Sequence, residues 1–147
     1  MQDKLKGLTA LRRAYFREVY PPDTDFQTLE ELTLAGFDQG RAKVTCVERD
    51  SKPVSMCLMS LMDKMPNARI PGGSVGEIYG VYTLPEYRGH GYATACVSEM
   101  LQIADALGLQ LVQLEASPMG RPVYEALGFK TDRMGYVTLK LEKETRP

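Results

Sequence analysis

The chain has 147 residues, a length typical of one globular domain, with 44% hydrophobic and 25% charged residues. Its formal net charge of -1 excludes the strongly basic surface that nucleic acids and anionic membranes attract. We therefore predict a single domain over residues 1–147 that has neither a nucleic-acid nor a membrane partner.

The cysteine and histidine content bears on metal sites and on the cellular compartment. Cys46, Cys57 and Cys96 are odd in number, widely spaced and set in apolar runs, and the chain has a single histidine. This pattern indicates reduced core cysteines, with no disulfide framework and no metal site. No signal-like segment or long apolar span is present, so a cytoplasmic protein is expected.

Two helices are expected at the start of the chain. The first spans residues 5–20 and ends at two prolines. Its apolar face consists of residues at helical spacing, namely Leu8, Leu11, Tyr15 and Val19. The second helix follows Asp25, a suitable N-cap, and continues to about residue 37. Its apolar side is predicted to consist of Leu29, Leu32 and Phe37.

Strands are expected next. Residues 42–48 and 54–62 are predicted to pair through a turn at residues 50–53. A loop rich in proline and glycine covers residues 63–76, and its length suggests a place at the mouth of a site. Residues 77–83 are predicted to form a further strand.

The C-terminal half begins with a helix over residues 92–107, followed by a short strand over residues 109–116. Together with the strand before the helix, this order predicts a parallel crossover unit. A short helix over residues 120–127 and a hairpin over residues 129–141, turning at residues 132–135, are expected to complete the chain. The fold class is therefore α/β with a mixed sheet.

The segment RGHGYA, from Arg88 to Ala93, lies between a predicted strand and a predicted helix. The start of a helix leaves backbone N–H groups without partners and carries the positive end of the helix dipole. Gly89 and Gly91 allow the backbone to approach an anion closely. The turn is therefore suited to a phosphate group, although a plain strand-to-helix turn accounts equally well for these glycines alone.

Two of three phosphate-binding patterns do not fit this segment. A P-loop requires Lys followed by Ser or Thr after its glycines, and that pair is absent. A dinucleotide fingerprint requires a third Gly or Ala where Thr94 stands. Its first glycine also follows the strand directly, whereas five residues (84–88) separate the predicted strand from Gly89 in this chain. The third pattern, Gln/Arg-x-x-Gly-x-Gly/Ala, belongs to the pyrophosphate loop of GNAT acetyltransferases. Arg88, Gly91 and Ala93 match it.

The resemblance to the GNAT superfamily extends beyond this loop. The run VYTLPEYRGHGYATA resembles the strand, turn and coenzyme loop of the family, and ASPMGRPVYEALGF resembles its second signature. The likeness covers roughly residues 41–141. It implies an acetyl-CoA-dependent N-acetyltransferase, an enzyme with a mostly antiparallel sheet, a splayed central parallel strand pair and flanking helices.

The resemblance also implies a coenzyme site, with acetyl-CoA as co-substrate and no metal. Pantetheine would lie between strands 77–83 and 109–116 and pair with the backbone of Val81, Tyr82 and Thr83. A backbone N–H near Val81 or Tyr82 would stabilise the oxyanion of the thioester. The pyrophosphate would be held by Arg88, Gly89, His90, Gly91, Tyr92, Ala93 and Thr94. Ser117 stands where the family often has an asparagine, so that polar contact with the coenzyme is weaker.

Two residues match the catalytic groups of the family. Removing a proton from a lysine-like amine at pH 7 costs about 4.6 kcal/mol, so a general base is useful. Glu77 matches the basic glutamate of the histone-acetyltransferase branch, with Glu115 on the facing strand as the alternative. Tyr124 matches the tyrosine that donates a proton to the departing thiolate. Cys96 lies in the apolar stripe of a helix, which argues against an acetyl-cysteine route.

Several points stay open in the sequence. The acceptor is an amine of a small molecule or a peptide, expected to enter over the two N-terminal helices and the loop 62–73. The first strand of the family has little room before residue 5, and a homodimer is compatible with the sequence. The alternatives are a GNAT-fold module that binds acyl-CoA without transferring it and, less favoured by the glycine pattern, a nucleotide-binding oxidoreductase fragment.

Overall fold

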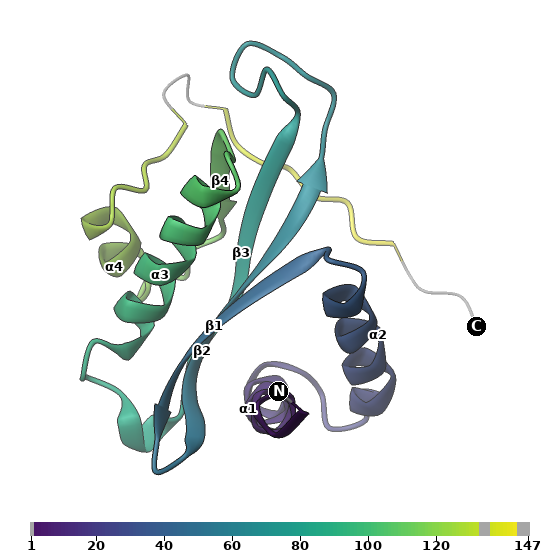
Figure 1. Ribbon diagram of the computed structural model, residues 1–147, viewed down its shortest axis with the longest axis vertical. Helices are drawn as coiled ribbons and strands as arrows, with labels where there is room; N and C mark the ends of the chain where they lie inside the picture. The colour runs from purple at the N-terminus through teal and green to yellow at the C-terminus, as the bar shows by residue number, and fades with distance from the viewer. Residues whose placement is uncertain (1, 133–135, 144–147) are drawn as a thin grey trace.

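The computed structural model describes residues 2–132 and 136–143, with side-chain burial from residue 7 onward. A twisted sheet separates two layers of helices, with α1 and α2 on one side and α3 and α4 on the other (Figure 1). This arrangement confirms the predicted α/β class with a mixed sheet and flanking helices.

The first two helices cover one face of the sheet. Helix α1 (Gln2–Val19) buries Leu8, Leu11 and Phe16. Val19, predicted to face the core, is 51% exposed, whereas Phe16 in the same turn of α1 is buried. In the described residues the chain is already helical at residue 2, so residues 2–4 do not supply the first strand of the family.

Helix α2 (Phe26–Asp38) begins as predicted, because the Asp25 carboxylate accepts a hydrogen bond from the Thr28 N–H at 3.1 Å. Its apolar side was predicted less well. Leu32 is 63% exposed, and Gly36 near the end of the helix is the buried position. Leu29 and Phe37 are partly buried and Phe37 packs against the core, so only Leu32 of the predicted apolar side remains in water.

The sheet contains four strands in the order β1-β2-β3-β4. The antiparallel strands are β1 (Ala42–Arg49), β2 (Lys52–Asp63) and β3 (Ser74–Thr83). Asp50 and Ser51 join β1 to β2 with φ angles of 52° and 63°, a two-residue hairpin turn shorter than predicted. Strand β3 also starts earlier than predicted, so the loop before it covers only residues 64–73.

The predicted parallel crossover is present. Helix α3 (Tyr92–Ala106) connects β3 to β4 (Leu111–Leu114), and these two strands pair in parallel. The short 3₁₀ helix η1 (Pro85–Tyr87) precedes α3, and α4 (Arg121–Ala126) follows β4. The pair was predicted to be central, but β4 is the last strand of the sheet over the described residues.

The predicted C-terminal hairpin is not formed in the described residues. Residues 129–132 and 136–143 have no strand, and most of the predicted turn lies outside the described residues. Val137, Leu139 and Leu141 are 77–87% exposed. An alternating pattern forms a strand only where one face is buried and the backbone has a partner, and this segment lacks both along the outer edge of β4.

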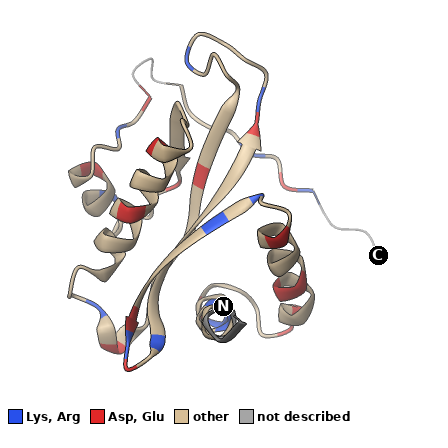
Figure 2. Ribbon diagram, in the orientation of Figure 1, with Lys and Arg blue, Asp and Glu red and all other residues tan. Residues whose placement is uncertain are grey.

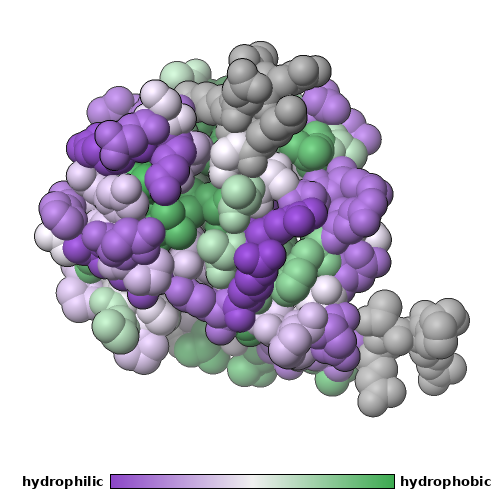
Figure 3. Space-filling view, turned by 90° about the horizontal axis from the view of Figure 1, so that it is seen from below, coloured by the Kyte–Doolittle hydropathy of each residue, from purple (hydrophilic) through white to green (hydrophobic). Residues whose placement is uncertain are grey.

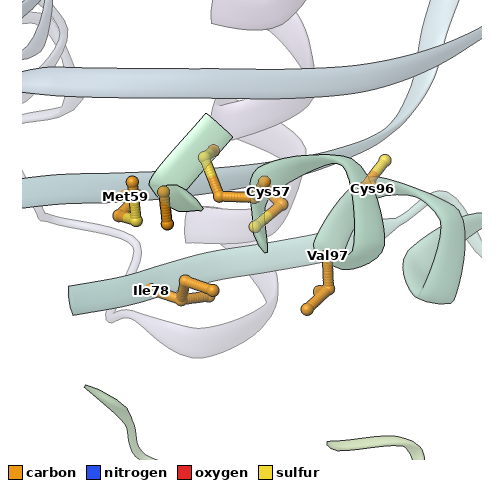
Figure 4. Packing of buried hydrophobic residues seen from close by; sticks show 7 residues of the cluster. Cys57, Met59, Ile78, Cys96 and Val97 are labelled. Atoms are coloured by element: carbon orange, nitrogen blue, oxygen red, sulfur yellow. The ribbon is translucent and has the colours of Figure 1, made fainter. Parts of the chain in front are cut away.

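The core has two parts, one on each face of the sheet. The first packs Leu8 and Leu11 of α1 against Met56 and Leu58 of β2. The second packs α3 on the sheet (Figure 4). The buried residues of this second part are Cys57, Met59, Ile78, Cys96, Val97, Met100 and Ala104. Cys96 is 1% exposed and is therefore a core residue, as predicted. Helices thus cover both faces of the sheet.

Charged residues of both signs are distributed over the surface (Figure 2). The face seen in Figure 3 is mainly hydrophilic, with smaller hydrophobic areas between the polar groups. Among the residues that the structure describes, no helix has both the length and the apolar character needed to cross a membrane.

Candidate active site

A bulge in β3 shapes the centre of the sheet. Tyr82 lies opposite Met56 and Tyr79 lies opposite Leu58, so two residues of β3 face one residue of β2. The extra residue falls at Gly80 and Val81, and Gly80 has a φ of +64°, which favours glycine. A bulge of this kind bends a strand and redirects its backbone groups. Position 80 therefore matters to the site, a feature that the sequence analysis did not identify.

Strands β3 and β4 stop pairing just before the bulge. Their pairing begins at Val75 and Leu111 and ends at Ile78 and Leu114, whereas β3 continues to Thr83. The splayed parallel pair implied by the family resemblance is thus present. Residues 79–83 of β3 have no neighbouring strand on the β4 side. An extended ligand can therefore pair with the backbone at this edge.

The orientation of the β3 backbone at this gap follows from one hydrogen bond. The Leu84 N–H donates to the Val54 carbonyl of β2 at 2.9 Å, so the Thr83 carbonyl points away from β2. Alternation back from Leu84 places the polar backbone groups of Thr83 on the open side. Those of Tyr82 face β2, so Tyr82 is not available for backbone pairing with a ligand in the gap.

The turn after β3 has the geometry of an anion-binding site. Gly89 and Gly91 have φ angles of +83° and +78°, and a side chain built on either would meet no atom within 4 Å. Gly91 is the N-cap of α3, and no side chain caps the helix. The first intrahelical bond joins the Ala95 N–H to the Gly91 carbonyl, so three earlier N–H groups have no intrahelical acceptor. They belong to Tyr92, Ala93 and Thr94.

The side chains of this turn are engaged in structural contacts. His90 Nδ1 lies 3.0 Å from the Tyr87 carbonyl oxygen, and the His90 ring stacks on Tyr92. The Tyr92 hydroxyl accepts a hydrogen bond from Arg49 Nε at 2.9 Å. These side chains hold the turn in place, and its backbone N–H groups are left as donors.

Arg88 ties the turn to α1. Its Nε donates to the Thr83 carbonyl at 2.9 Å, and its Nη2 lies 3.3 Å from a carboxylate oxygen of Glu18. The Tyr82 hydroxyl donates to the same carboxylate at 2.9 Å. Burial is the main cause that raises the pKa of Tyr82, and the hydrogen bond with Glu18 raises it further. Glu18 is separated from Arg88 by 70 residues in the sequence, so no local pattern could have identified this contact.

Tyr124 lies on α4, half-buried, with its ring edge-on to Phe129 at 6.1 Å. Burial raises the pKa of its phenol, and Cys57 and Tyr15 raise it further. The phenol therefore stays protonated at neutral pH and can donate a proton.

Ser117 positions the turn that leads into α4. Its hydroxyl oxygen accepts from the Gly120 N–H at 3.1 Å, and its carbonyl accepts from the N–H groups of Gly120 and Arg121. The Ser117 hydroxyl can still donate one hydrogen bond, so a contact with a ligand is compatible with this role.

The two candidate bases lie on neighbouring strands. Glu77 is opposite Gln113 of β4, and Glu115 directly follows β4. Glu115 forms an ion pair with Lys140, and this contact is the first cause that raises the pKa of Lys140. Glu77 adds to the same effect, so both carboxylates lie near this lysine. Glu115 is thus ion-paired and exposed, whereas Glu77 is partly buried on β3.

The buried thiols are poor nucleophiles. Burial raises the pKa of Cys57 to about 12, with a smaller contribution from Cys96. Burial also raises the pKa of Cys96, whose thiol lies 3.8 Å from the Ser55 hydroxyl. Only a thiolate attacks a thioester efficiently, so neither residue is suited to carry an acyl group at neutral pH.

A cavity of about 1140 Å³ lies beside β4, between β4, α4 and the C-terminal segment. It is lined by all four residues of β4, by Tyr124 and by residues of the C-terminal segment, and it includes no residue of β3. It therefore borders β4 and α4, and not β3. Ala68 and Arg69 of the loop 64–73 reach it.

These features define a class: a mixed α/β protein whose parallel strands part beside an anion-binding helix start. Comparison with known proteins gives the family. A profile of the acetyltransferase (GNAT) family matches residues 5–129. The chain therefore belongs to the acetyltransferase (GNAT) family, and the predicted enzyme class is confirmed at this level.

Individual relatives are more distant. A glucosamine 6-phosphate N-acetyltransferase from Trypanosoma brucei brucei is 31% identical over 88 residues, which are 60% of this chain and 58% of that protein. The chain thus matches little more than half the length of this relative.

Two solved structures share the fold. A predicted acetyltransferase from Clostridium acetobutylicum, solved with acetyl-CoA, has a TM-score of 0.80 at 23% identity, over 95% of this chain and 92% of that one. A glucosamine-6-phosphate N-acetyltransferase from Arabidopsis thaliana has a TM-score of 0.71 at 17% identity, over 97% and 92%. At these identities the likeness concerns the fold.

Proposed function

We propose that the protein is an N-acetyltransferase that transfers the acetyl group of acetyl-CoA to a primary amine. The observation that carries this proposal is the parting of β3 from β4 directly beside the glycine turn. The turn has room for a diphosphate, since nothing lies within 4 Å of a side chain built at Gly89 or Gly91. We also propose a cytoplasmic location, which the three free cysteines support.

The geometry supports a proposal for the residues that would hold acetyl-CoA. The N–H groups of Gly89 to Thr94 would bind the diphosphate at the positive end of the α3 dipole. Val81 and Thr83 would pair with the pantetheine amides on the open edge of β3. The N–H of Val81, redirected by the bulge, would donate to the thioester carbonyl and stabilise its negative charge as the amine attacks.

Two residues would provide the acid–base chemistry, Glu77 on β3 and Tyr124 on α4. Glu77 lies three residues before Gly80, about 10 Å along the strand at about 3.3 Å per residue, so it would take the proton of the amine through water. Tyr124 would donate a proton to the departing thiolate. The high pKa of Cys57 supports direct attack by the amine, without an acyl-enzyme.

The test is a thiol-release assay with acetyl-CoA and a panel of amino sugars, polyamines, amino acids and peptides. We expect free coenzyme A with at least one amine. A protein that binds acetyl-CoA but releases no thiol would instead be a binding module. Binding of a nicotinamide dinucleotide in place of acetyl-CoA would favour the oxidoreductase alternative.

Tyr124→Phe removes the proposed acid with little change in shape. We expect kcat to fall at least tenfold while the Kd for acetyl-CoA stays within a factor of two. Because the pKa of Tyr124 is raised, the donor form persists above pH 10, so the wild-type kcat should not fall through Tyr124 ionisation below that pH. Unchanged turnover in the variant would remove Tyr124 from the acid role.

A further inference from the structure

Arg12 is a partly buried cation between α1, α2 and β3. Its Nη2 donates to the Thr33 hydroxyl at 3.2 Å, and its Cζ lies 4.6 Å from the centre of the Phe16 ring. Its Nε is buried and has no hydrogen-bond partner among the described residues. Burial lowers the pKa of this guanidinium.

The positive charge of Arg12 is not balanced by a carboxylate. Among the side chains that the structure describes, none places a carboxylate oxygen within 4 Å of it. The ionisable groups that influence its pKa are tyrosines: Tyr79, Tyr15 and Tyr20. Taking an unpaired charge out of water costs several kcal/mol, so such a residue calls for an anionic partner.

The neighbouring Arg13 shows the contrast. It forms two hydrogen bonds with the Glu30 carboxylate of α2, at 2.7 and 3.0 Å, and it is exposed. Basic residues lie on α1 and acidic residues on α2 (Figure 2). A carboxylate on the adjacent helix thus satisfies Arg13, whereas Arg12 points past it toward the sheet.

Arg12 lies beside the bulge of β3. A Cβ built on Gly80 would be 3.7 Å from Arg12 Nη1. The cavity between α1 and α2 that Arg12 also lines measures about 20 Å³, room for about one water molecule. An anion larger than a water molecule does not fit in this cavity, so it would have to reach Arg12 from outside it, on the side of Gly80.

We infer that Arg12 recognises an anionic group, a carboxylate or a phosphate, on the acceptor amine. This inference depends on the proposed function, because the bulge locates the reacting carbonyl. A guanidinium binds either anion through two parallel hydrogen bonds. With the anion on Arg12, the amine of a small molecule lies next to Gly80 and Val81, so the charge fixes the position of the nucleophile. The acceptor is therefore an amino acid or an amine carrying a phosphate.

The experiment measures kcat/KM for amines that differ only in the anion. Glucosamine 6-phosphate is compared with glucosamine, and alanine with alaninamide. In one of the two pairs we expect kcat/KM to be at least tenfold higher for the anionic amine than for its uncharged counterpart. The pair that shows this preference tells whether Arg12 binds a phosphate or a carboxylate. In Arg12→Met the ratio should fall to near one. Arg13→Met, the matched control, should keep the wild-type ratio. Arg12→Lys, which keeps the charge but not the paired donors, should lower the ratio at least threefold.

The inference is overturned if the wild-type protein prefers neither anionic member, or if Arg12→Met and Arg12→Lys both keep the preference. If no amine in the two pairs is acetylated, calorimetric titration of the same amines into the protein saturated with coenzyme A decides. An anionic amine must then bind at least tenfold more weakly to a folded Arg12 variant than to wild type, and any other result refutes the role of Arg12. Absence of coenzyme A binding would instead refute the proposed function.

Discussion

Gly91→Ala tests the anion-binding turn. Gly91 has a φ of +78°, a conformation that costs an L-residue about 1–2 kcal/mol. No atom lies within 4 Å of the added Cβ, so this backbone cost is the whole effect expected on the free protein. For a domain of this size, about 2–4 °C per kcal/mol gives a fall in Tm of between about 2 and 8 °C.

The effect on coenzyme binding should be separate from this loss. The new methyl group occupies the open space that a diphosphate requires, and losing one hydrogen bond to a charged group costs about 1.5–3 kcal/mol. The KM for acetyl-CoA should therefore rise at least tenfold, with a smaller change in kcat. The assays are thermal unfolding and thiol release at varied acetyl-CoA concentration.

Gly108→Ala is the matched control. Gly108 follows α3 at its other end, with a φ of +72° and no atom within 4 Å of an added Cβ. Both variants should lose similar stability, but only Gly91→Ala should raise the KM. An equal rise in KM in the two variants, or none in either, would refute the reasoning that places the diphosphate at this turn.

Two further predictions concern proton transfer and the thiols. Glu77→Gln should lower kcat at least tenfold at pH 7, and less at pH 10, where more of the amine is already deprotonated. Glu115→Gln should change kcat less than threefold. The reverse order of the two variants would make Glu115 the base. Cys57 and Cys96 should remain unmodified by an aromatic disulfide reagent at pH 8 in the folded protein and react after unfolding, because burial raises the pKa of both thiols. Rapid reaction of either thiol in the native state would contradict the closed core beside α3.

Local patterns were enough to predict most of the fold and part of the site. The Asp25 cap, the helix α3 with its buried Cys96 and the glycine turn from Arg88 to Ala93 all depend on neighbours within a few residues. Their chemistry is local, since a cap or a helix start presents the same backbone groups wherever it occurs. The family followed from two such segments in the correct order.

Tertiary structure decided what depends on distant partners. The bulge at Gly80 appears only when β3 is aligned with β2, and Glu18 meets Arg88 only because α1 crosses that face of the sheet. The segment 136–143 has the alternation of a strand, yet in the described residues it has no paired edge and its apolar side chains stay exposed. The sequence by itself determined the local elements and the anion-binding turn. Only the packed structure decided which side chains share the gap and which charge is left without a partner, because these outcomes depend on contacts between residues far apart in the chain.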